Sequence, residues 1–314
     1  MNDYQTEYKV DTKLNTQGKN LFINGLYAIA LLLLIVSCDY DDEQPYLDEP
    51  GQGETATYAI SGNDISLNAN QLNSSSFYAN ETNHRTLWAF FSNLIPAEIR
   101  PQLVELELFA DANDDTEAFV AAINENDLSR WEIGFNLTTV WNDAQEFQES
   151  RVAYNSIHEF AHILTLNNDQ INVGGSESTC ENFFTGEGCS TQSSFINAFF
   201  NNYWSDIYNE SQSFEIDDDD AFFAFYDKYE DRFVSEYAST NPGEDIADSF
   251  TIFVLTDSPS SNQIKDQKVR FFYEYPELVE LRTLIRSNMD FEINFGQVSE
   301  ARLQRMKVRG KELH

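Results

Sequence analysis

Residues 145–166, QEFQESRVAYNSIHEFAHILTL, contain no Gly or Pro and place apolar side chains at helical spacing. This pattern predicts one long helix with a single buried stripe. Within it, His158, Glu159 and His162 form the pattern HExxH. Residues four apart on a helix lie on the same face, so this helix is expected to present two imidazoles side by side.

Two imidazoles with a carboxylate beside them are the groups that a hydrolytic zinc site needs. His158 and His162 can bind one zinc ion, and Glu159 is placed to accept a proton from the attacking water. Only four His occur in the chain, and two of them fall in this motif. We therefore predict a zinc site here, the alternative being that these side chains occupy an exposed helix face.

A hydrolytic zinc site also has a third protein ligand and an open position for water. Neither His84, in a predicted tether, nor His314, the last residue, is attractive as this ligand. The extended pattern that supplies a third His is missing, because Asn168 stands where that His would be. The third ligand is therefore expected to be a carboxylate.

The best carboxylate candidate lies in NPGEDIADSF, at residues 241–250. Asn241 is a good N-cap and Pro242 suits the first helical position, so a helix is predicted to begin here. Glu244 falls in its first turn, with Asp248 one turn later on the same face. This spacing allows Glu244 to bind zinc while Asp248 orients an imidazole of the first helix.

HEFAH followed about 80 residues later by NPGEDIADSF resembles the gluzincin class of zinc metallopeptidases. Over about residues 87–290, the chain is most similar to the zinc-binding metallopeptidase lipoproteins encoded near outer-membrane nutrient-uptake systems. It also resembles the catalytic domain of anthrax lethal factor, where a Glu in such a helix is the third ligand. Asp248 departs from the Glu that is more usual at its place.

The resemblance implies a zincin-like fold, a zinc cofactor and a peptide or protein substrate. In the toxin, a Tyr precedes the ligand Glu by seven residues, and Tyr237 matches it here. Tyr237 is therefore a candidate donor to the oxyanion that forms on the attacked carbonyl. A packed Tyr at a helix end is the alternative.

The first forty residues predict export. Three Lys precede eleven uninterrupted apolar residues at 26–36. Spanning a bilayer takes about 20 residues, so this run fits a signal-peptide core better, the alternative being a short uncleaved anchor. The run leads into Cys38, which resembles the lipidated Cys of bacterial lipoproteins. The acidic residues 39–43 resemble an export tag for the outer face of the outer membrane, the alternative being a solvated linker. An outer-membrane lipoprotein is therefore expected, facing either the periplasm or the cell surface.

The net charge of the chain indicates which kinds of partner it can bind. The chain has 53 acidic and 19 basic residues, a formal charge of −34, and such a surface repels nucleic acid. The expected partners are a peptide substrate, the membrane and outer-membrane uptake proteins.

Two cysteines of the mature chain can form a disulfide. The compartment beyond the inner membrane is oxidising, so Cys180 and Cys189 can pair. The alternative is that both thiols bind zinc.

The organisation that we predict is a signal peptide at 1–37, an acidic tether at 38–86, a metallopeptidase domain at 87–290 and a basic tail at 291–314. The domain is expected to be α+β, with a small mixed sheet, an active-site helix and a largely helical C-terminal lobe. Strands are predicted at 57–60, 103–109 and 131–141. Helices are predicted at 116–123, 145–166, 193–208, 221–237, 244–255, 263–273 and 276–287.

The function predicted is therefore that of a zinc-dependent peptidase. The alternative is a non-catalytic accessory lipoprotein of a nutrient-uptake complex, in which zinc is structural or absent. Its docking face would be the aromatic residues 222–226, for which core packing is the other explanation. Acidic clusters at 111–115 and 217–220 are predicted to be solvated turns and helix caps, with calcium binding as the alternative.

Overall fold

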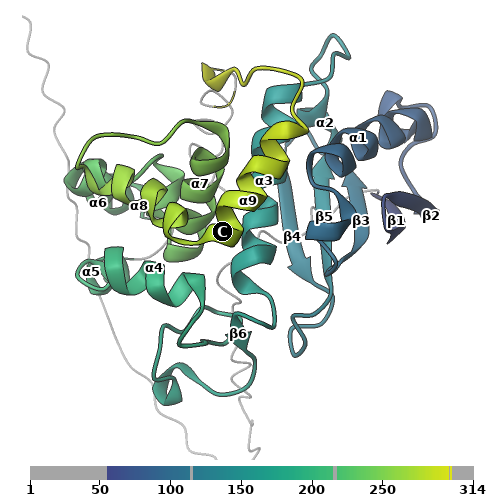
Figure 1. Cartoon of the computed structure of the whole chain (residues 1–314). Coiled ribbons are helices and arrows are strands. Elements are labelled where there is room, and N and C mark those ends of the chain that lie inside the picture. The colour runs from purple at the N-terminus through teal and green to yellow at the C-terminus, as the bar shows by residue number, and fades with distance from the viewer. Residues whose placement is uncertain (1–54, 114–115, 215–217, 297, 299–314) are drawn as a thin grey trace, which may run out of the picture. The chain divides into compact units, whose positions relative to one another are not determined.

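A five-stranded mixed sheet, in the order β2-β1-β3-β5-β4, forms one side of the domain in the computed structural model (Figure 1). The structure describes residues 55–113, 116–214, 218–296 and 298. The described chain is 48% helical and 16% strand, which confirms the predicted α+β class. The predicted signal peptide, Cys38 and most of the basic tail lie outside the described residues.

The strands pair antiparallel except for β3 with β5, which run parallel. In β3, Leu106 and Leu108 are fully buried while Glu105 and Glu107 lie on the opposite face, as alternation predicts. The bounds are β1 (Thr55–Ser61), β2 (Asp64–Asn70), β3 (Leu103–Phe109), β4 (Ala118–Ala122) and β5 (Trp131–Asn136), with a separate ribbon of β6 (Ile171–Asn172) and β7 (Cys189–Ser190).

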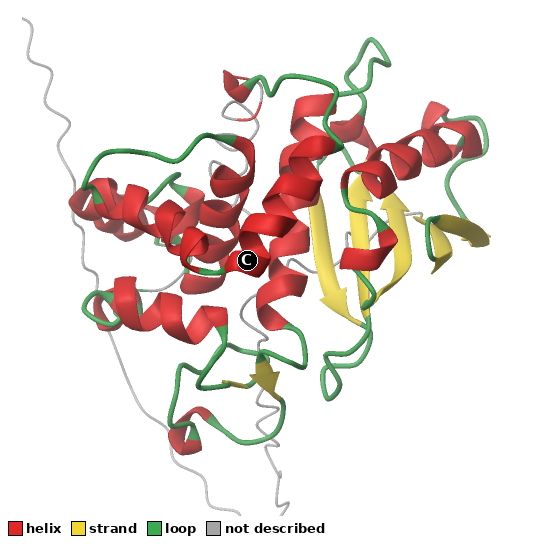
Figure 2. Cartoon of the chain, in the orientation of Figure 1, coloured by secondary structure: helices red, strands yellow, loops and turns green. Residues whose placement is uncertain are grey.

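Helices make up the rest of the domain, and α3 lies between the sheet and the helical lobe (Figures 1 and 2). It packs against β4 on one side and against α7 on the other. None of the helices in the described ranges is long and apolar enough to cross a membrane. The bounds are α1 (Glu81–Leu94), α2 (Leu137–Val140), α3 (Glu149–Leu166), α4 (Phe195–Tyr203), α5 (Tyr208–Ser211), α6 (Asp219–Tyr229), α7 (Pro242–Leu255), α8 (Ile264–Phe271) and α9 (Pro276–Ser287).

The prediction of a helix at residues 116–123 is wrong, because this segment forms the edge strand β4. Its pairing with β5 puts Phe119 opposite Gly134. A Cβ on Gly134 would lie 1.9 Å from the Phe119 ring, so the glycine leaves the space that this ring fills. Pairing and packing along the strand therefore outweigh the local helix preference of its alanines.

The predicted tether is also partly wrong, because residues 55–86 are already part of the folded domain. The predicted strand at 57–60 is confirmed, since it lies within β1. β1 joins the sheet beside β3 and buries Tyr58, although the segment is polar overall. His84 is fully buried on α1. Its Nδ1 and the Tyr58 hydroxyl are 2.6 Å apart, and its Nε2 lies 2.6 Å from the carbonyl oxygen of Tyr78. His84 is thus part of the core.

Three other predicted elements end earlier than expected. The strand at 131–141 stops at Asn136, whose side chain accepts a hydrogen bond from Thr138 N–H and caps α2. α4 ends at Tyr203. α6 ends at Tyr229, where a 3-10 turn redirects the chain and buries Phe233.

The described parts of the two acidic clusters act as a turn and a cap. Asp111 accepts a hydrogen bond from the amide of Asn113, and Asp218 accepts one from Ala221 N–H at the start of α6. Both contacts are within hydrogen-bonding distance, at 2.8 and 3.0 Å. This is the local role that the predicted turns and caps require.

Candidate metal centre

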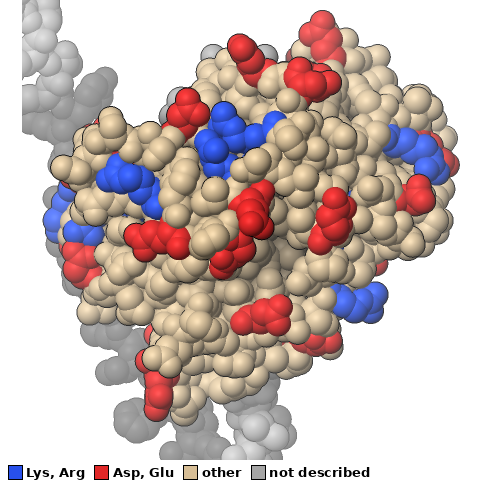
Figure 3. All heavy atoms as spheres, in the orientation of Figure 1, with Lys and Arg blue, Asp and Glu red and all other residues tan. Residues whose placement is uncertain are grey.

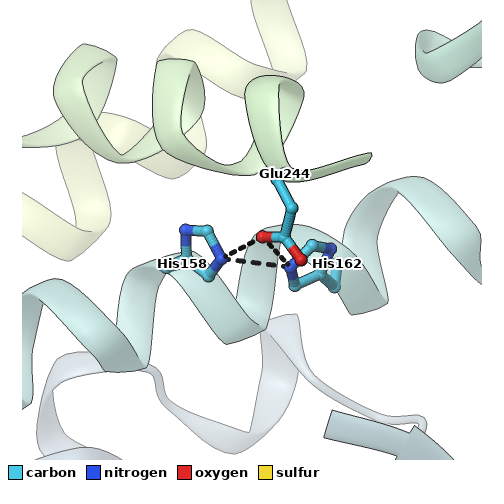
Figure 4. Close-up of side chains that lie close together, drawn as sticks. All are labelled: His158, His162 and Glu244. Carbon is cyan, nitrogen blue, oxygen red and sulfur yellow. Dashed lines mark hydrogen bonds and ion pairs between the residues drawn. The ribbon is translucent and has the colours of Figure 1, made fainter. Parts of the chain in front are cut away.

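Three side chains from α3 and α7 meet at one point (Figure 4). His158 Nε2 lies 3.0 Å from Glu244 Oε2, and His162 Nε2 lies 3.4 Å from the same oxygen. The two Nε2 atoms are 3.1 Å apart. The ligand atoms therefore form a nearly equilateral triangle, built from two residues on one helix and one residue 82 positions further along the chain.

The size of this triangle fits a metal ion. A tetrahedral zinc site, with bonds of about 2.0–2.1 Å, holds its ligand atoms about 3.3 Å apart. The sides measured here lie between 3.0 and 3.4 Å. All three side chains are buried, and they form the one such group of His, Cys, Asp or Glu that we find in the described ranges. They could hold a metal ion.

The start of α7 fixes the position of Glu244. The Asn241 side chain accepts a hydrogen bond from Glu244 N–H at 2.9 Å, and Pro242 occupies the first turn. The predicted helix start is therefore confirmed. Because α7 packs against α3, a carboxylate in the first turn of α7 reaches the imidazoles of α3. Asn241 thus determines at which residue the ligand helix begins.

Asp248, one turn later on α7, orients the first imidazole. Its Oδ1 lies 2.8 Å from His158 Nδ1, so in the neutral imidazole that a metal requires, Nδ1 carries the hydrogen and Nε2 offers its lone pair to the centre. Asp248 also accepts hydrogen bonds from the hydroxyls of Tyr154 and Ser235. Sequence reasoning missed both residues. Tyr154 lies one turn before His158 on α3, a spacing that could have identified it, whereas nothing in the sequence points to Ser235.

Glu159 and Tyr237 are both buried, and each adjoins His158, Glu159 in the sequence and Tyr237 through its ring. Glu159 follows His158 on α3 and is 5% exposed. Tyr237 begins a 3-10 turn just before α7, and its ring centroid lies 5.8 Å from that of His158. The structure therefore brings Tyr237 to His158 from a position 79 residues downstream in the chain.

Burial and close contacts shift the pKa values of His158 and Glu244. Burial acts to lower the pKa of His158, but hydrogen bonds and charge from Asp248 and Glu244 outweigh it and raise the pKa to about 9. Burial acts to raise the pKa of Glu244, but the charge of His162 and the hydrogen bonds of both histidines hold it well below its usual value. Glu244 is therefore a carboxylate at neutral pH.

Metal binding at pH 7 is expected to release close to one proton. Without a metal ion, His158 has a pKa of about 9 and carries a proton at pH 7, whereas a ligating imidazole must be neutral. Affinity should therefore rise with pH, up to about tenfold per unit, and level off above about pH 9. Calorimetric titration of zinc in buffers of different ionisation enthalpy measures this proton.

The matched variant for that titration is Asp248→Asn, which removes a negative partner of His158 and should reduce the release. Heats of zinc binding that do not depend on the buffer would contradict the assigned charge state of His158.

A buried ion pair beside Glu244 holds α7 in the lobe. The Asp245 carboxylate accepts hydrogen bonds from Lys268 Nζ on α8 and from Trp204 Nε1, and both members of the pair are fully buried. Burial raises the pKa of Asp245 to about 6 and lowers the pKa of Lys268. Sequence reasoning missed this pair, because nothing local links Asp245 to a Lys 23 residues later.

Lys268→Met is expected to lower the free energy of unfolding by about 3–5 kcal/mol, since it leaves the Asp245 carboxylate buried without its cation. Urea denaturation followed by circular dichroism measures the change. Lys228→Met is the control, because Lys228 pairs with Glu210 in solvent and should leave the denaturation midpoint unchanged. Equal midpoints for the two variants would contradict the role of the buried pair.

Two cysteines of the domain form a disulfide. Cys180 bonds to Cys189, where β7 begins, and neither belongs to the His and Glu group above. Cys38 and His314 lie outside the described residues. Comparisons of the chain with models of protein families, with curated proteins and with solved structures found no match.

Proposed function

We propose that the chain is a zinc-dependent metallopeptidase of the gluzincin type, with a zincin-like fold. The observation that carries the proposal is the triangle formed by His158 Nε2, His162 Nε2 and Glu244 Oε2, with sides of 3.0–3.4 Å. The HExxH residues supply two corners and the capped start of α7 supplies the third. Glu159, on the same helix, completes the set that hydrolysis requires.

When bound at these three residues, a zinc ion would act as a Lewis acid and lower the pKa of water to about 7. Glu159 accepts the proton of the attacking water and passes it to the departing amine. Tyr237 donates its hydroxyl hydrogen to the oxyanion that develops on the carbonyl. Asp248 keeps His158 in the tautomer whose Nε2 faces the centre.

The edge of the sheet supports the proposal that the substrate is a peptide. β4 is the strand at one end of the sheet, antiparallel to β5, and it packs against α3. An extended peptide can add to such an edge through main-chain hydrogen bonds. A peptide on β4 would run along the helix that carries His158, Glu159 and His162.

We further propose that the protein is a lipoprotein of the outer membrane, attached through lipid on Cys38 and working beside nutrient-uptake proteins. The support for this part is the signal-like run at residues 26–36, its position before Cys38 and the acidic residues that follow.

The test combines metal analysis with digestion of a broad peptide library by the mature chain purified with zinc. The proposal predicts one zinc ion per chain and cleavage of a defined subset of peptides, with both lost on chelation and restored by added zinc. One zinc ion per chain without cleavage of any peptide would contradict the peptidase and favour the accessory lipoprotein.

A further inference from the structure

A pocket opens directly beside His162. About 410 Å³ of space without protein atoms lies in and above it, and this volume includes open solvent at its mouth. One wall comes from the loop between the two cysteines and the other from α3, α4, α5 and the start of α7. Its lining includes His162, Phe183, Phe184, Glu187 and Tyr208. Because a proposed metal ligand forms part of its wall, whatever occupies the pocket lies next to the reacting bond.

The cysteine loop is held rigidly enough to form a wall. The Cys180–Cys189 disulfide closes it, and β6 pairs with β7 across its base. Phe183 stacks on Phe200 with centroids 4.1 Å apart, and the Ser190 hydroxyl donates to the Phe183 carbonyl oxygen at 2.6 Å. The aromatic wall is therefore formed before any ligand binds.

Gly188 brings the loop close to β6. Its φ is +156°, and a Cβ there would lie 2.5 Å from the carbonyl oxygen of Asn172. Only glycine allows this approach. The neighbouring Glu187 is thereby kept at the pocket.

Glu187 is the one carboxylate among the residues that line the pocket. Burial raises its pKa, while a hydrogen bond from the Thr185 side chain and the charge of His162 act to lower it. Glu187 and His162 line the same pocket, although Glu187 is not part of the ligand group. Such a carboxylate among aromatic and aliphatic walls is suited to a cation with a long apolar stem.

We propose that this pocket binds a Lys or Arg side chain of the peptide substrate, at a position next to the cleaved bond. This inference rests on the proposed function. The stem packs against Phe183, Phe184 and Tyr208, and the cationic head pairs with Glu187. The chain as a whole has a formal charge of −34, which attracts cationic peptides to the protein. On the face in Figure 3, acidic side chains lie among basic ones.

The test uses N-acetylated fluorogenic peptides that differ only at one position flanking the cleaved bond. Arg is compared with citrulline and Lys with norleucine, because each second residue matches the first in shape and lacks its charge. The wild type should prefer the charged member of each pair by about 10- to 100-fold in kcat/KM. Glu187→Gln should abolish the preference, and Glu187→Lys should reverse it.

Glu181→Gln is the control, since Glu181 lies exposed in the same loop and does not line the pocket. It should keep the wild-type preference. Zinc content should be equal in wild type and Glu187→Gln, because Glu187 is not a ligand. Cleavage that shows no preference, or a preference that survives in Glu187→Gln, overturns the pocket assignment and leaves the peptidase standing. A requirement for a free amino terminus in place of Lys or Arg also overturns it.

Measurements of peptide binding test the pocket assignment independently of whether the protein hydrolyses peptides. Fluorescence anisotropy of the labelled peptides with the Glu159→Gln protein needs no hydrolysis. A preference for Arg over citrulline that depends on Glu187 supports the pocket even if the wild type cleaves nothing. Equal affinity for the two peptides overturns it.

Discussion

Glu159→Gln is expected to keep one zinc ion per chain and to lower kcat for peptide hydrolysis by about 10²- to 10⁴-fold. The amide matches the carboxylate in shape but cannot accept the proton of the attacking water. Glu159 is not a corner of the ligand triangle, so metal binding should not change. Steady-state kinetics on a cleaved peptide and zinc analysis of the same sample measure the two effects.

Glu149→Gln is the matched control, because Glu149 lies exposed in the first turn of the same helix. It should leave both kcat and zinc content unchanged. A Glu159→Gln protein that cleaves peptides as fast as the wild type would show that the proton goes elsewhere and that the mechanism is wrong.

His162→Ala and Glu244→Gln are expected to lose both zinc and hydrolysis. Loss of a residue that merely orients a ligand typically weakens metal binding 10- to 100-fold. Removal of a direct ligand should therefore weaken it by more than about 100-fold. Competition with a chromogenic chelator measures the affinity, and the peptide assay measures the activity.

The control for these two variants is Glu280→Ala, which removes an exposed carboxylate on α9. It should bind zinc as the wild type does. Retention of stoichiometric zinc by Glu244→Gln, with affinity unchanged, would contradict the assignment of the third ligand. Circular dichroism of each variant separates metal loss from unfolding.

The parts of the centre that follow from local rules could be predicted from the sequence. Spacing on a helix puts His158 and His162 on one face, and the cap at Asn241 puts Glu244 in a first turn. Whether those two helices meet depends on packing across the whole domain, and the structure shows that they do. Tyr154 could have been predicted, because it lies one turn before His158 on α3. Ser235 and the Asp245–Lys268 pair could not, because their contacts join residues that no local sequence pattern connects.

The errors in the fold arise where strand pairing outweighs local preference. The residues of β4 resemble a helix because three of its five are Ala, but β5 supplies hydrogen bonds that a helix would forgo. The hairpin of β1 and β2 resembles a linker because most of its side chains are polar. It nevertheless belongs to the folded domain, because Ala56 and Tyr58 of β1 are buried in the core.

Anomalous diffraction at the zinc absorption edge, from crystals of the zinc-loaded mature protein, tests the central claim most directly. We expect one strong peak about 2.0–2.1 Å from His158 Nε2, His162 Nε2 and a carboxylate oxygen of Glu244. Crystals that contain one zinc ion per chain but show the peak away from these three residues would contradict the account.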